Sequence, residues 1–588
     1  MIIPQYTASA PRRGEFLTRR LNGGLNYASV RSLTSSELRD GGDIDLFPSG
    51  AVGTRRALIP FTKCQIPNPV VAAWSWQSPQ GVDYMFIELL GGEIKMASRL
   101  NDEGDIADCF TSSPFPNMVS FVPAHAWTAA GKLYVASPNY VHEWDGVAAS
   151  STSVITSTIH PMTVTPQATN QGVPGNFTAA TYRDVVFIGG VTITGEDPDA
   201  VAWSTAVAER PVGEPLAGQI AGQKDFFENQ RITFIGGRSA EGIIKLVAAG
   251  PSLYAFKPHS VHAIATNGTT VLSNDLSTQI GLAGFNAVCA TNGTVFFFDE
   301  NEGLHVIEGA STPKRIFDPI FPLLECGRIR NVGNVAVGYD GGKVFVSCAL
   351  DTDGANNVTF VLNTNLQALT PGGAWSKWDI GFSAFEPWVP ARGGSGLVGF
   401  TTKPVAAVRV NECSDSSLDD YGFVKNPVRP WFKTAFFDDS IPTAAKVWGK
   451  PSLDLSGSGT ARVSVGTEAG EPIAVPGEPW CETPTGADME LSRLGWKPIE
   501  ATLTEDCDTD CLSIGDGWCF TDSRGGQERA GYVCGDQLKV DEGTVRVAEL
   551  QYPGTGVAFA ASVRDNGSTG PWQVTQLSAR YRLTQECE

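Results

Sequence analysis

The chain has 588 residues, 42% of them hydrophobic, and a formal net charge of −20. This hydrophobic content is sufficient for a folded core and argues against a wholly disordered chain. An acidic surface repels phosphate backbones, which disfavours sequence-specific binding of nucleic acid, and no apolar run is long enough for membrane insertion.

Short strands are expected along the whole chain. The 64 Gly and 37 Pro residues divide it into short runs, and no long window shows apolar residues at helical spacing. Many of these runs are rich in β-branched and aromatic residues, which is typical of strands. The sequence therefore predicts an all-β protein.

Residues 1–22 are predicted to form an extended, Arg-rich arm. Arg12-Arg13 and Arg19-Arg20 lie in a stretch without strand alternation, and residues 1–60 carry eight Arg against five acidic residues, a net charge of +3. We expect the arm to become ordered against a partner. A frayed, solvated tail is the alternative.

The N-terminal stretch, residues 23–60, combines turn and strand signals. It contains Gly23-Gly24-Leu25-Asn26, a segment at 33–38 that could form one capped helical turn, and an acidic strand at 43–47 that leads to Gly53-Thr54-Arg55-Arg56. The alternating apolar residues of this strand need a cover. We therefore expect the N-terminal stretch to pack with the C-terminal part of the chain.

A repeated unit organises residues 61–410. In 118–146, apolar runs at 118–122, 131–136 and 140–144 are separated by turn residues, as in an antiparallel meander. Similar turns begin at positions 91, 131, 183, 250, 292, 341 and 393, with spacings of 40, 52, 67, 42, 49 and 52 residues. Four-stranded propeller blades recur at about 40–50 residues, so the pattern predicts a β-propeller of six or seven blades. An array of two-sheet sandwiches is the alternative.

Residues 411–588 differ in character, with 15 basic and 28 acidic residues and thus a net charge of −13. Strands are expected at 431–434, 445–448 and 461–465, and at the end of the chain, where apolar and polar residues alternate from Leu577 to Leu583. We expect 411–480 and 541–588 to form a β-sandwich-like platform together with the N-terminal stretch. Residues 481–540 are predicted to be an acidic, cysteine-containing insertion.

The order of motifs in the N-terminal stretch, ahead of a propeller, resembles the tail nozzle or hub proteins of short-tailed bacteriophages. The final strands, which follow Pro571-Trp572, are also similar to that family. The resemblance implies a structural subunit of the virion that is made in the host cytoplasm and has no enzymatic activity and no cofactor. It would form a homo-oligomeric ring of six copies below the portal and adaptor proteins, with tail fibre or spike proteins as further partners. Genome DNA would pass through the ring without specific binding.

Six of the twelve cysteines lie between residues 481 and 588: Cys481, Cys507, Cys511, Cys519, Cys534 and Cys587. Cys507 and Cys511 form a close pair, but no second pair and no histidine accompany them, so zinc is not indicated. One or two disulfides, or free thiols, are the alternatives.

Three other patterns are weak as sites. Asp506, Asp508 and Asp510 alternate as in a calcium loop, but Cys511 and Gly517 stand where such a loop needs Gly and Glu. His259 and His262 are three residues apart and would point to opposite faces of a strand. The segment 565–569 resembles the Asp-box turn of sialidase propellers, but it occurs once and outside the blades. The sequence therefore predicts no catalytic, metal-binding or cofactor-binding residue.

The leading prediction is a ring-forming nozzle or hub that forms part of a DNA ejection conduit. Two other classes of protein stay open as alternatives. A carbohydrate-active propeller enzyme would need a cluster of carboxylates in the central funnel. A host-receptor-binding propeller protein would act without forming a ring.

Overall fold

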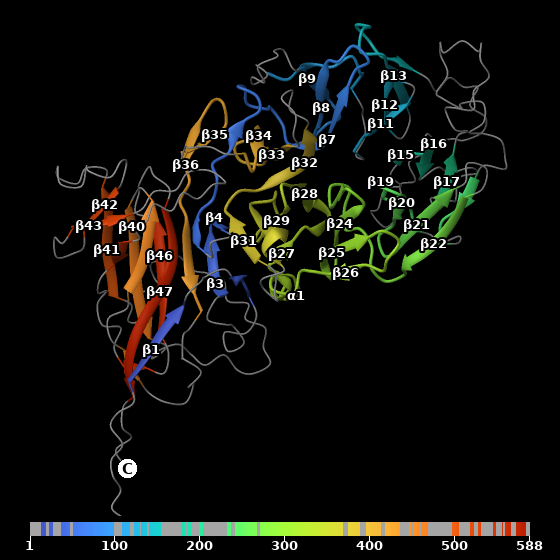
Figure 1. The fold of residues 1–588 in the computed structure, drawn as a ribbon. Coiled ribbons are helices and arrows are strands. Elements are labelled where there is room, and N and C mark those ends of the chain that lie inside the picture. The colour runs from blue at the N-terminus through green and yellow to red at the C-terminus, as the bar shows by residue number, and fades with distance from the viewer. Residues whose placement is uncertain are drawn as a thin grey trace, which may run out of the picture.

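The computed structural model describes residues 13–18, 23–27, 37–47, 51–98, 109–117, 123–129, 131–137, 140–153, 178–183, 185–189, 199–203, 232–236, 241–266, 271–367, 374–388, 396–412 and 418–435. Beyond residue 435 it describes a set of strands between residues 446 and 583. The described residues form an all-β protein with two parts, a β-propeller and a β-sandwich-like domain (Figure 1).

In the described residues, the propeller consists of seven antiparallel sheets of mostly four strands, which follow one another along the chain. Blade 1 has β7 (Val70–Gln77), β8 (Asp83–Leu89), β9 (Ile94–Ser98) and β10 (Thr111–Ser112). Blade 2 has β11 (His125–Ala129), β12 (Lys132–Ser137), β13 (Tyr140–Trp144) and β14 (Thr152–Ser153). Blade 3 has β15 (Thr178–Tyr182), β16 (Val185–Gly189), β17 (Ala200–Trp203) and β18 (Ile232–Phe234). Blade 4 has β19 (Lys245–Ala249), β20 (Ser252–Phe256), β21 (Val261–Thr266) and β22 (Val271–Ser277); blade 5 has β23 (Val288–Thr291), β24 (Thr294–Asp299), β25 (Gly303–Glu308) and β26 (Lys314–Arg315).

Blade 6 has β28 (Ala336–Asp340), β29 (Lys343–Leu350), β30 (Val358–Asn363) and β31 (Ala374–Trp378), with β27 (Ile329–Arg330) beside β29. Blade 7 has β32 (Phe382–Trp388), β33 (Gly396–Thr401) and β34 (Ala407–Val410), and its fourth strand is β6 (Ile59–Pro60) from the N-terminal stretch. Two short helices, α1 (Phe321–Glu325) and α2 (Thr364–Gln367), lie in the connections. No helix of the described residues is long and apolar enough to cross a membrane.

The ring of blades is closed. The first strand of each blade contacts the first strand of the next one, from β7 through β11, β15, β19, β23 and β28 to β32, and β32 contacts β7 again. Closure protects the strand edges that a single meander would expose. The predicted propeller is therefore confirmed, and the described strands form seven blades.

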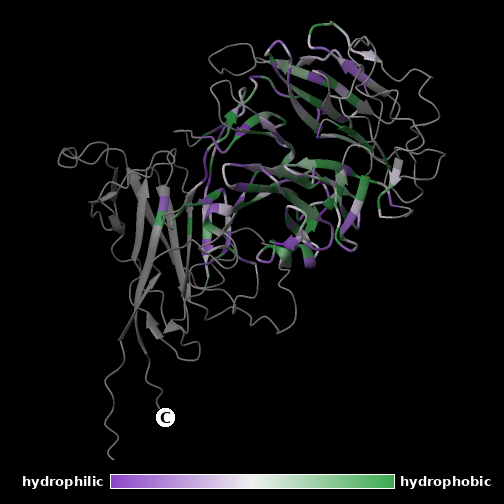
Figure 2. Cartoon of the chain, turned by 45° about the vertical axis from the view of Figure 1, so that its right-hand side comes forward, coloured by the Kyte–Doolittle hydropathy of each residue, from purple (hydrophilic) through white to green (hydrophobic). Residues whose placement is uncertain are grey.

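The middle strands of the blades are buried on both faces. All residues of β16, β30 and β33 are buried, because neighbouring blades cover both sides of each sheet. Figure 2 shows hydrophobic residues along the strands of the propeller and hydrophilic residues mainly in its connections. Burial therefore does not alternate in these strands, unlike in a sheet with one solvated face.

The predicted turns correspond to blade turns, with one exception. Turns at 131, 183, 250, 292 and 341 connect the first and second strands of blades 2 to 6, and Gly131 and Gly250 have the positive φ that such turns need. The turn at 91 instead connects the second and third strands of blade 1, because Gly91-Gly92 carries the same turn chemistry. The turn at 393 and the predicted run 118–122 lie outside the described residues; β11 pairs with β12 instead.

The β-sandwich-like domain consists of two large sheets at the left of Figure 1. The first contains β1 (Arg13–Thr18), β4 (Ile44–Leu46), β5 (Val52–Thr54), β38 (Lys446–Trp448), β39 (Ser452–Gly457), β44 (Val545–Val547), β45 (Thr555–Gly556) and β47 (Trp572–Leu583). The second runs in the order β2 (Gly24–Leu25), β3 (Glu37–Gly42), β37 (Trp431–Thr434), β46 (Phe559–Asp565), β40 (Thr460–Thr467), β41 (Lys497–Thr504), β42 (Trp518–Thr521) and β43 (Gln527–Ala530). A hairpin of β35 (Leu418–Asp420) and β36 (Lys425–Pro427) precedes β37.

The N-terminal stretch supplies strands to both sheets and to blade 7, so it joins the two parts of the molecule. Three expectations for the chain need correction. Residues 13–18 of the arm pair with β47 of the same chain. Glu37 and Leu38, placed at the end of a helical turn, lie in β3. The strands β41 to β43, within the predicted insertion 481–540, extend the second sheet.

Candidate functional site

The histidines singled out in the sequence have separate environments. His259 lies in an exposed turn, with its Nδ1 2.7 Å from Oε1 of Glu241. His262 is buried on β21, with its Nδ1 2.8 Å from Oδ1 of Asp275 and its Nε2 2.9 Å from Oγ of Ser260. The two side chains therefore share no ligand, and each has its own hydrogen-bond partners.

Most of the other candidates lie outside the described residues, namely Cys481, Cys507, Cys511, Cys534, Cys587 and residues 506–510 and 566–569. Cys519 lies in β42, and Asp565 ends β46. Within the described part of the chain, no group of His, Cys, Asp and Glu is arranged to hold a metal ion. Among the described residues, paired buried charges lie at the junction between the two domains, and titratable side chains gather at the centre of the propeller.

At the junction, Arg55 is a buried cation with two carboxylate partners. Its Nε donates to Oδ1 of Asp43 at 2.7 Å, and its two terminal nitrogens donate to the carboxylate of Asp419 at 2.8 and 2.5 Å. The guanidinium also lies 5.3 Å from the ring centroid of Trp378. Burial alone would lower the pKa of Arg55, but the carboxylates of Asp419 and Asp43 outweigh burial and raise this pKa well above its usual value. One charged side chain thus joins the N-terminal stretch, the β35 strand and blade 6.

A second contact ties β4 to blade 6. The carboxylate of Asp45 accepts hydrogen bonds from Nζ of Lys343 at 2.8 Å and from Nε1 of Trp378 at 3.3 Å. The Asp45 side chain is almost fully buried, so its charge depends on these donors.

A third contact ties β3 and β37 to β31. Nζ of Lys377 lies 3.4 Å from Oδ1 of Asp40 and 5.1 Å from the ring centroid of Trp431, while the Tyr27 hydroxyl donates to Asp40 at 2.8 Å. Burial would raise the pKa of Asp40, but Lys377 and the hydrogen bonds lower it. Charge pairs and hydrogen bonds therefore connect the N-terminal stretch, β35 and β37 to blade 6.

At the propeller centre, the axial segment, residues 284–286, lies across the ring. Nδ2 of Asn286 donates to the carbonyl oxygens of Val71 in blade 1 and Ser383 in blade 7, at 2.9 and 3.1 Å. The backbone carbonyl of Asn286 accepts from the amide of Val337 in blade 6 at 2.8 Å. These partners lie near the starts of the first strands of blades 1, 7 and 6, which are neighbours in the ring. Together with the contacts of Phe285 to blades 2 and 4, they place the segment at the propeller centre, at the end where the first strands begin.

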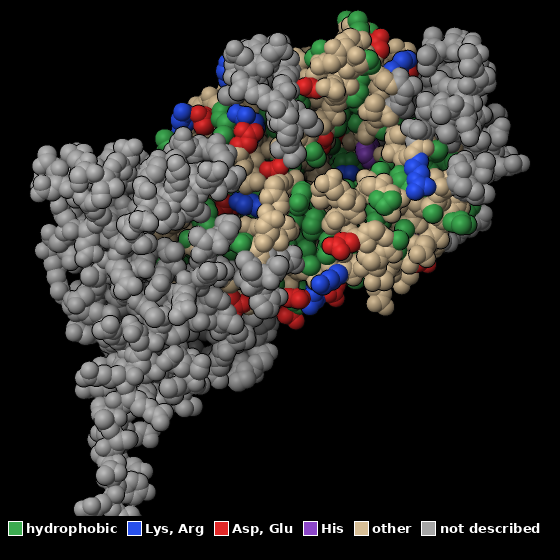
Figure 3. Space-filling model, in the orientation of Figure 1, with side chains coloured by type: hydrophobic (Ala, Val, Ile, Leu, Met, Phe, Trp, Pro, Cys, Tyr) green, Lys and Arg blue, Asp and Glu red, His purple; other side chains and the backbone are tan. Residues whose placement is uncertain are grey.

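The ring of Phe285 connects the axial segment to two further blades. It lies 4.3 Å from Nζ of Lys245 in blade 4 and 5.7 Å, in edge-to-face geometry, from the ring of His125 in blade 2. Figure 3 shows that one face of the propeller is hollowed near its centre, where a histidine and a basic side chain are visible.

The channel cluster, which we define as His125, Lys245 and Glu386, consists of half-buried titratable groups with shifted pKa values. Burial raises the pKa of Glu386 to about 7, and its Oε1 accepts hydrogen bonds from the amide and hydroxyl of Ser75 at 2.8 and 3.0 Å. Burial lowers the pKa of Lys245 to about 8 and, together with the Lys245 charge, that of His125 to about 3. Nδ1 of His125 accepts from the amide of Ala179, so the imidazole is neutral.

The chemistry available to this cluster is limited by its composition. A glycosidase commonly uses two carboxylates that flank the scissile bond. The channel cluster offers one carboxylate, an amine and a neutral imidazole, and the axial segment crosses the channel beside them. These groups can bind or orient a polar molecule, but they do not form a carboxylate pair.

Sequence reasoning missed the residues that matter at both places. Arg55 belongs to the segment Gly53-Thr54-Arg55-Arg56, but its partner Asp419 lies 364 positions later in the chain. Lys245, Phe285, Asn286 and Glu386 carried no signal, because they occur singly in ordinary strand or turn contexts. A buried arginine is almost always paired with an acidic residue, but the sequence does not identify which residue that is.

No family model and no curated protein matches the chain. Among solved structures, BBS1N, crystallised in complex with ARL6DN, is 9% identical with a TM-score of 0.35, over 60% of this chain and 97% of that chain. The extracellular domain of the two-component system BT4673 from B. thetaiotaomicron is 10% identical with a TM-score of 0.34, over 81% of this chain and 52% of that chain. These similarities are too distant to indicate a function for this chain.

Proposed function

We propose that the chain is a structural subunit of a bacteriophage tail, a ring-forming nozzle or hub that lies below the portal and adaptor proteins. It is made in the host cytoplasm and becomes part of the virion. The proposal rests on the resemblance in residues 23–60 and is supported by one observation of the fold. The N-terminal stretch supplies separate strands to both sandwich sheets and to blade 7, so one segment of the chain contributes to the propeller and to the sandwich.

A body of this kind suits a ring. In a ring of identical subunits, each subunit contacts its neighbours through two different surfaces, and the ring closes only if every contact has the same rotation. A variable angle between propeller and sandwich would change the rotation between neighbouring subunits and prevent the ring of subunits from closing. The paired charges of Arg55, Asp45 and Lys377 hold that angle, which is what a ring of six copies requires.

The proposed conduit for DNA is the axis of the ring and not the channel of a propeller. The axial segment lies at the propeller centre, where Asn286 is hydrogen-bonded to blades 1 and 7 and Phe285 contacts blades 2 and 4, so a duplex has no straight path there. Genome DNA would instead pass along the surface that six copies present to their common axis. The acidic charge of the chain would keep this passage weakly adhesive.

Electron microscopy of the purified full-length chain, alone and with an adaptor protein, tests the proposal. We expect ring-shaped particles with six-fold symmetry, and light scattering should give a mass near that of six copies. Arg55→Ala should reduce the fraction of rings strongly, whereas Arg330→Ala, which removes an exposed ion pair with Asp353, should leave it unchanged.

Two other results would replace the proposal. A monomer that hydrolyses surface glycans, and loses this activity in Glu386→Gln, would indicate a carbohydrate-active enzyme. A monomer that binds host cells without hydrolysis would indicate a receptor-binding propeller protein.

A further inference from the structure

The propeller ring closes between blades 7 and 1, and few backbone hydrogen bonds hold the closing strand. This strand, β6, pairs with β34 over two residues, Ile59 opposite Arg409 and Pro60 opposite Val408. Pro60 has no N–H and cannot donate to the ladder. Past β6, the amide of Phe61 donates to the carbonyl of Ala407 at 2.9 Å.

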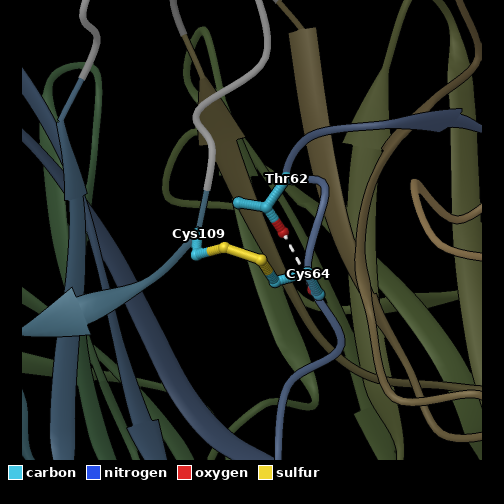
Figure 4. Close-up of a disulfide and its surroundings, with 3 residues drawn as sticks. All are labelled: Thr62, Cys64 and Cys109. Atoms are coloured by element: carbon cyan, nitrogen blue, oxygen red, sulfur yellow. Dashed lines mark hydrogen bonds between the residues drawn. A yellow bond between two sulfur atoms is a disulfide. The ribbon is translucent and has the colours of Figure 1, made fainter.

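A covalent bond lies directly beside this seam. Cys64 follows β6, Cys109 precedes β10 in blade 1, and the two form a disulfide with a Cα–Cα distance of 5.1 Å (Figure 4). This distance lies within the usual range for disulfides. The bond therefore joins the segment that completes blade 7 to the outer strand of blade 1.

Apolar contacts also cross the seam. The ring of Phe61 lies 5.1 Å from that of Trp388 in blade 7 and 6.4 Å from that of Phe110, which follows Cys109. These contacts do not depend on the oxidation state of the cysteines. The ring of blades can therefore close before the disulfide forms, and the disulfide then adds a constraint to a closed ring.

Outside this disulfide, the cysteines whose side chains are described are Cys289, Cys326 and Cys348. Burial raises the pKa of both Cys289 and Cys348 to about 12, so these remain thiols. Cys64 and Cys109 are half-exposed and, unlike these three, lie close enough to each other to form a disulfide.

We propose that Cys64 and Cys109 form a redox-controlled lock of the propeller seam. In a reducing environment both are thiols, and the seam is held by noncovalent contacts, among them the β6 pairing, the Phe61 contacts and the hydrogen bonds between Ser75 and Glu386. In an oxidising environment the disulfide fixes the N-terminal stretch to blade 1. The inference does not depend on the proposed function.

The oxidation step uses a low-molecular-weight disulfide such as oxidised glutathione. The thiolate of one cysteine attacks it, forms a mixed disulfide and releases one small thiol. The second thiolate then displaces the other small thiol and forms the Cys64–Cys109 bond. The protein loses two electrons and two protons, and the small disulfide is reduced to two thiols.

Peptide mapping of the full-length protein tests the lock. After incubation with oxidised glutathione, a peptide containing Cys64 should be cross-linked to one containing Cys109, and dithiothreitol should release both. Failure to cross-link in a protein with native circular dichroism would overturn the proposal.

Amide hydrogen exchange tests the effect on the seam. The amides of Phe61 and Ile66, which donate to Ala407 and Val405, should exchange roughly tenfold more slowly in the oxidised protein than in the reduced one. The double variant Cys64→Ser/Cys109→Ser should exchange at the reduced rate under both conditions. Cys326→Ser, which replaces a cysteine that follows α1 and is in no disulfide, is the control and should behave as wild type. Equal exchange in oxidised and reduced wild-type protein would show that the disulfide does not lock the seam.

Discussion

The interface between blades 1 and 2 and the junction between propeller and sandwich are both buried, but different interactions hold them. Between the blades, aromatic rings pack together, with Trp144 5.4 Å from Trp76 and 5.0 Å from Tyr84. At the junction, Arg55 and Asp419 form a buried ion pair. Apolar packing is not directional and can adjust, whereas a buried ion pair needs both partners in one geometry. We infer that packing closes the ring and that charge pairing sets the orientation of the domains.

The largest effect should come from the junction. Arg55→Ala leaves Asp43 and Asp419 buried without their cation, and breaking a buried pair in this way costs about 3–5 kcal/mol. Urea denaturation should show a lower midpoint, and small-angle scattering should show a less defined angle between the domains. Arg330→Ala, at an exposed pair with Asp353, should cost about 0–1 kcal/mol. Equal losses in the two variants would contradict the role of Arg55.

A cavity in the propeller core should lower the stability of the protein without changing the orientation of the propeller relative to the sandwich. Leu253 on β20 is fully buried between blades 3 and 4, and Leu→Ala changes in such sites cost about 2–5 kcal/mol. Leu253→Ala should therefore lower the urea midpoint but leave the scattering profile of the native protein unchanged. A changed profile would show that packing inside the propeller also sets the domain angle.

Removing the Asn286 side chain from the axial segment should reduce stability by an intermediate amount, mainly in blades 1 and 7, which this side chain bridges. Asn286→Ala leaves the carbonyls of Val71 and Ser383 without their donor, at a cost of about 1–3 kcal/mol. Hydrogen exchange should accelerate in blades 1 and 7 more than in blade 4. Asn301→Ala, at an exposed turn position, is the control, and the same exchange pattern in both variants would argue against a bridging role.

The smallest effect should be a pH dependence from the channel cluster. Burial raises the pKa of Glu386 to about 7, whereas the unfolded chain should have a value of about 4.3. The folded state therefore holds this proton more tightly, and the resulting stability is present below about pH 4.3 and lost as the pH rises through about 7.

Glu386→Gln removes this dependence. Relative to wild type, the variant should gain about 1–2 kcal/mol between about pH 5 and about pH 7.5, measured as the difference in thermal midpoints. Asn301→Ala, at an exposed position without a titratable side chain, is the control and should keep the wild-type pH dependence. If the difference in stability between Glu386→Gln and wild type stays constant with pH, the pKa of Glu386 is the same in the folded and the unfolded chain.

Much of the blade architecture could be predicted because its signals are local. A turn residue such as Gly131 or Gly250, followed by an apolar run, is contained within one meander and repeats along the chain. The same local chemistry also misplaced one boundary, since Gly91-Gly92 forms an equally good turn one strand later in blade 1. A repeat count is thus more robust than the position of any one turn.

The candidate site could not be predicted in the same way. Arg55 and Asp419 are 364 positions apart, and Asn286 and Val71 are 215 apart, so no periodicity relates them. In the sequence, an acidic residue such as Glu386 resembles a solvated surface charge. Its shifted pKa arises only when the closed ring buries it.

The sequence by itself determined that this protein is all-β, that its middle part repeats a strand meander, and that the first 60 residues are basic within an acidic chain. The tertiary structure decided that seven described blades close the ring, that β6 completes blade 7, and that Arg55, rather than an exposed arginine, holds the junction. The physical reason is the range of the interactions. Strand alternation and turns depend on neighbouring residues, whereas a buried ion pair, a bridging amide and a ring closure depend on which distant segments the fold brings into contact.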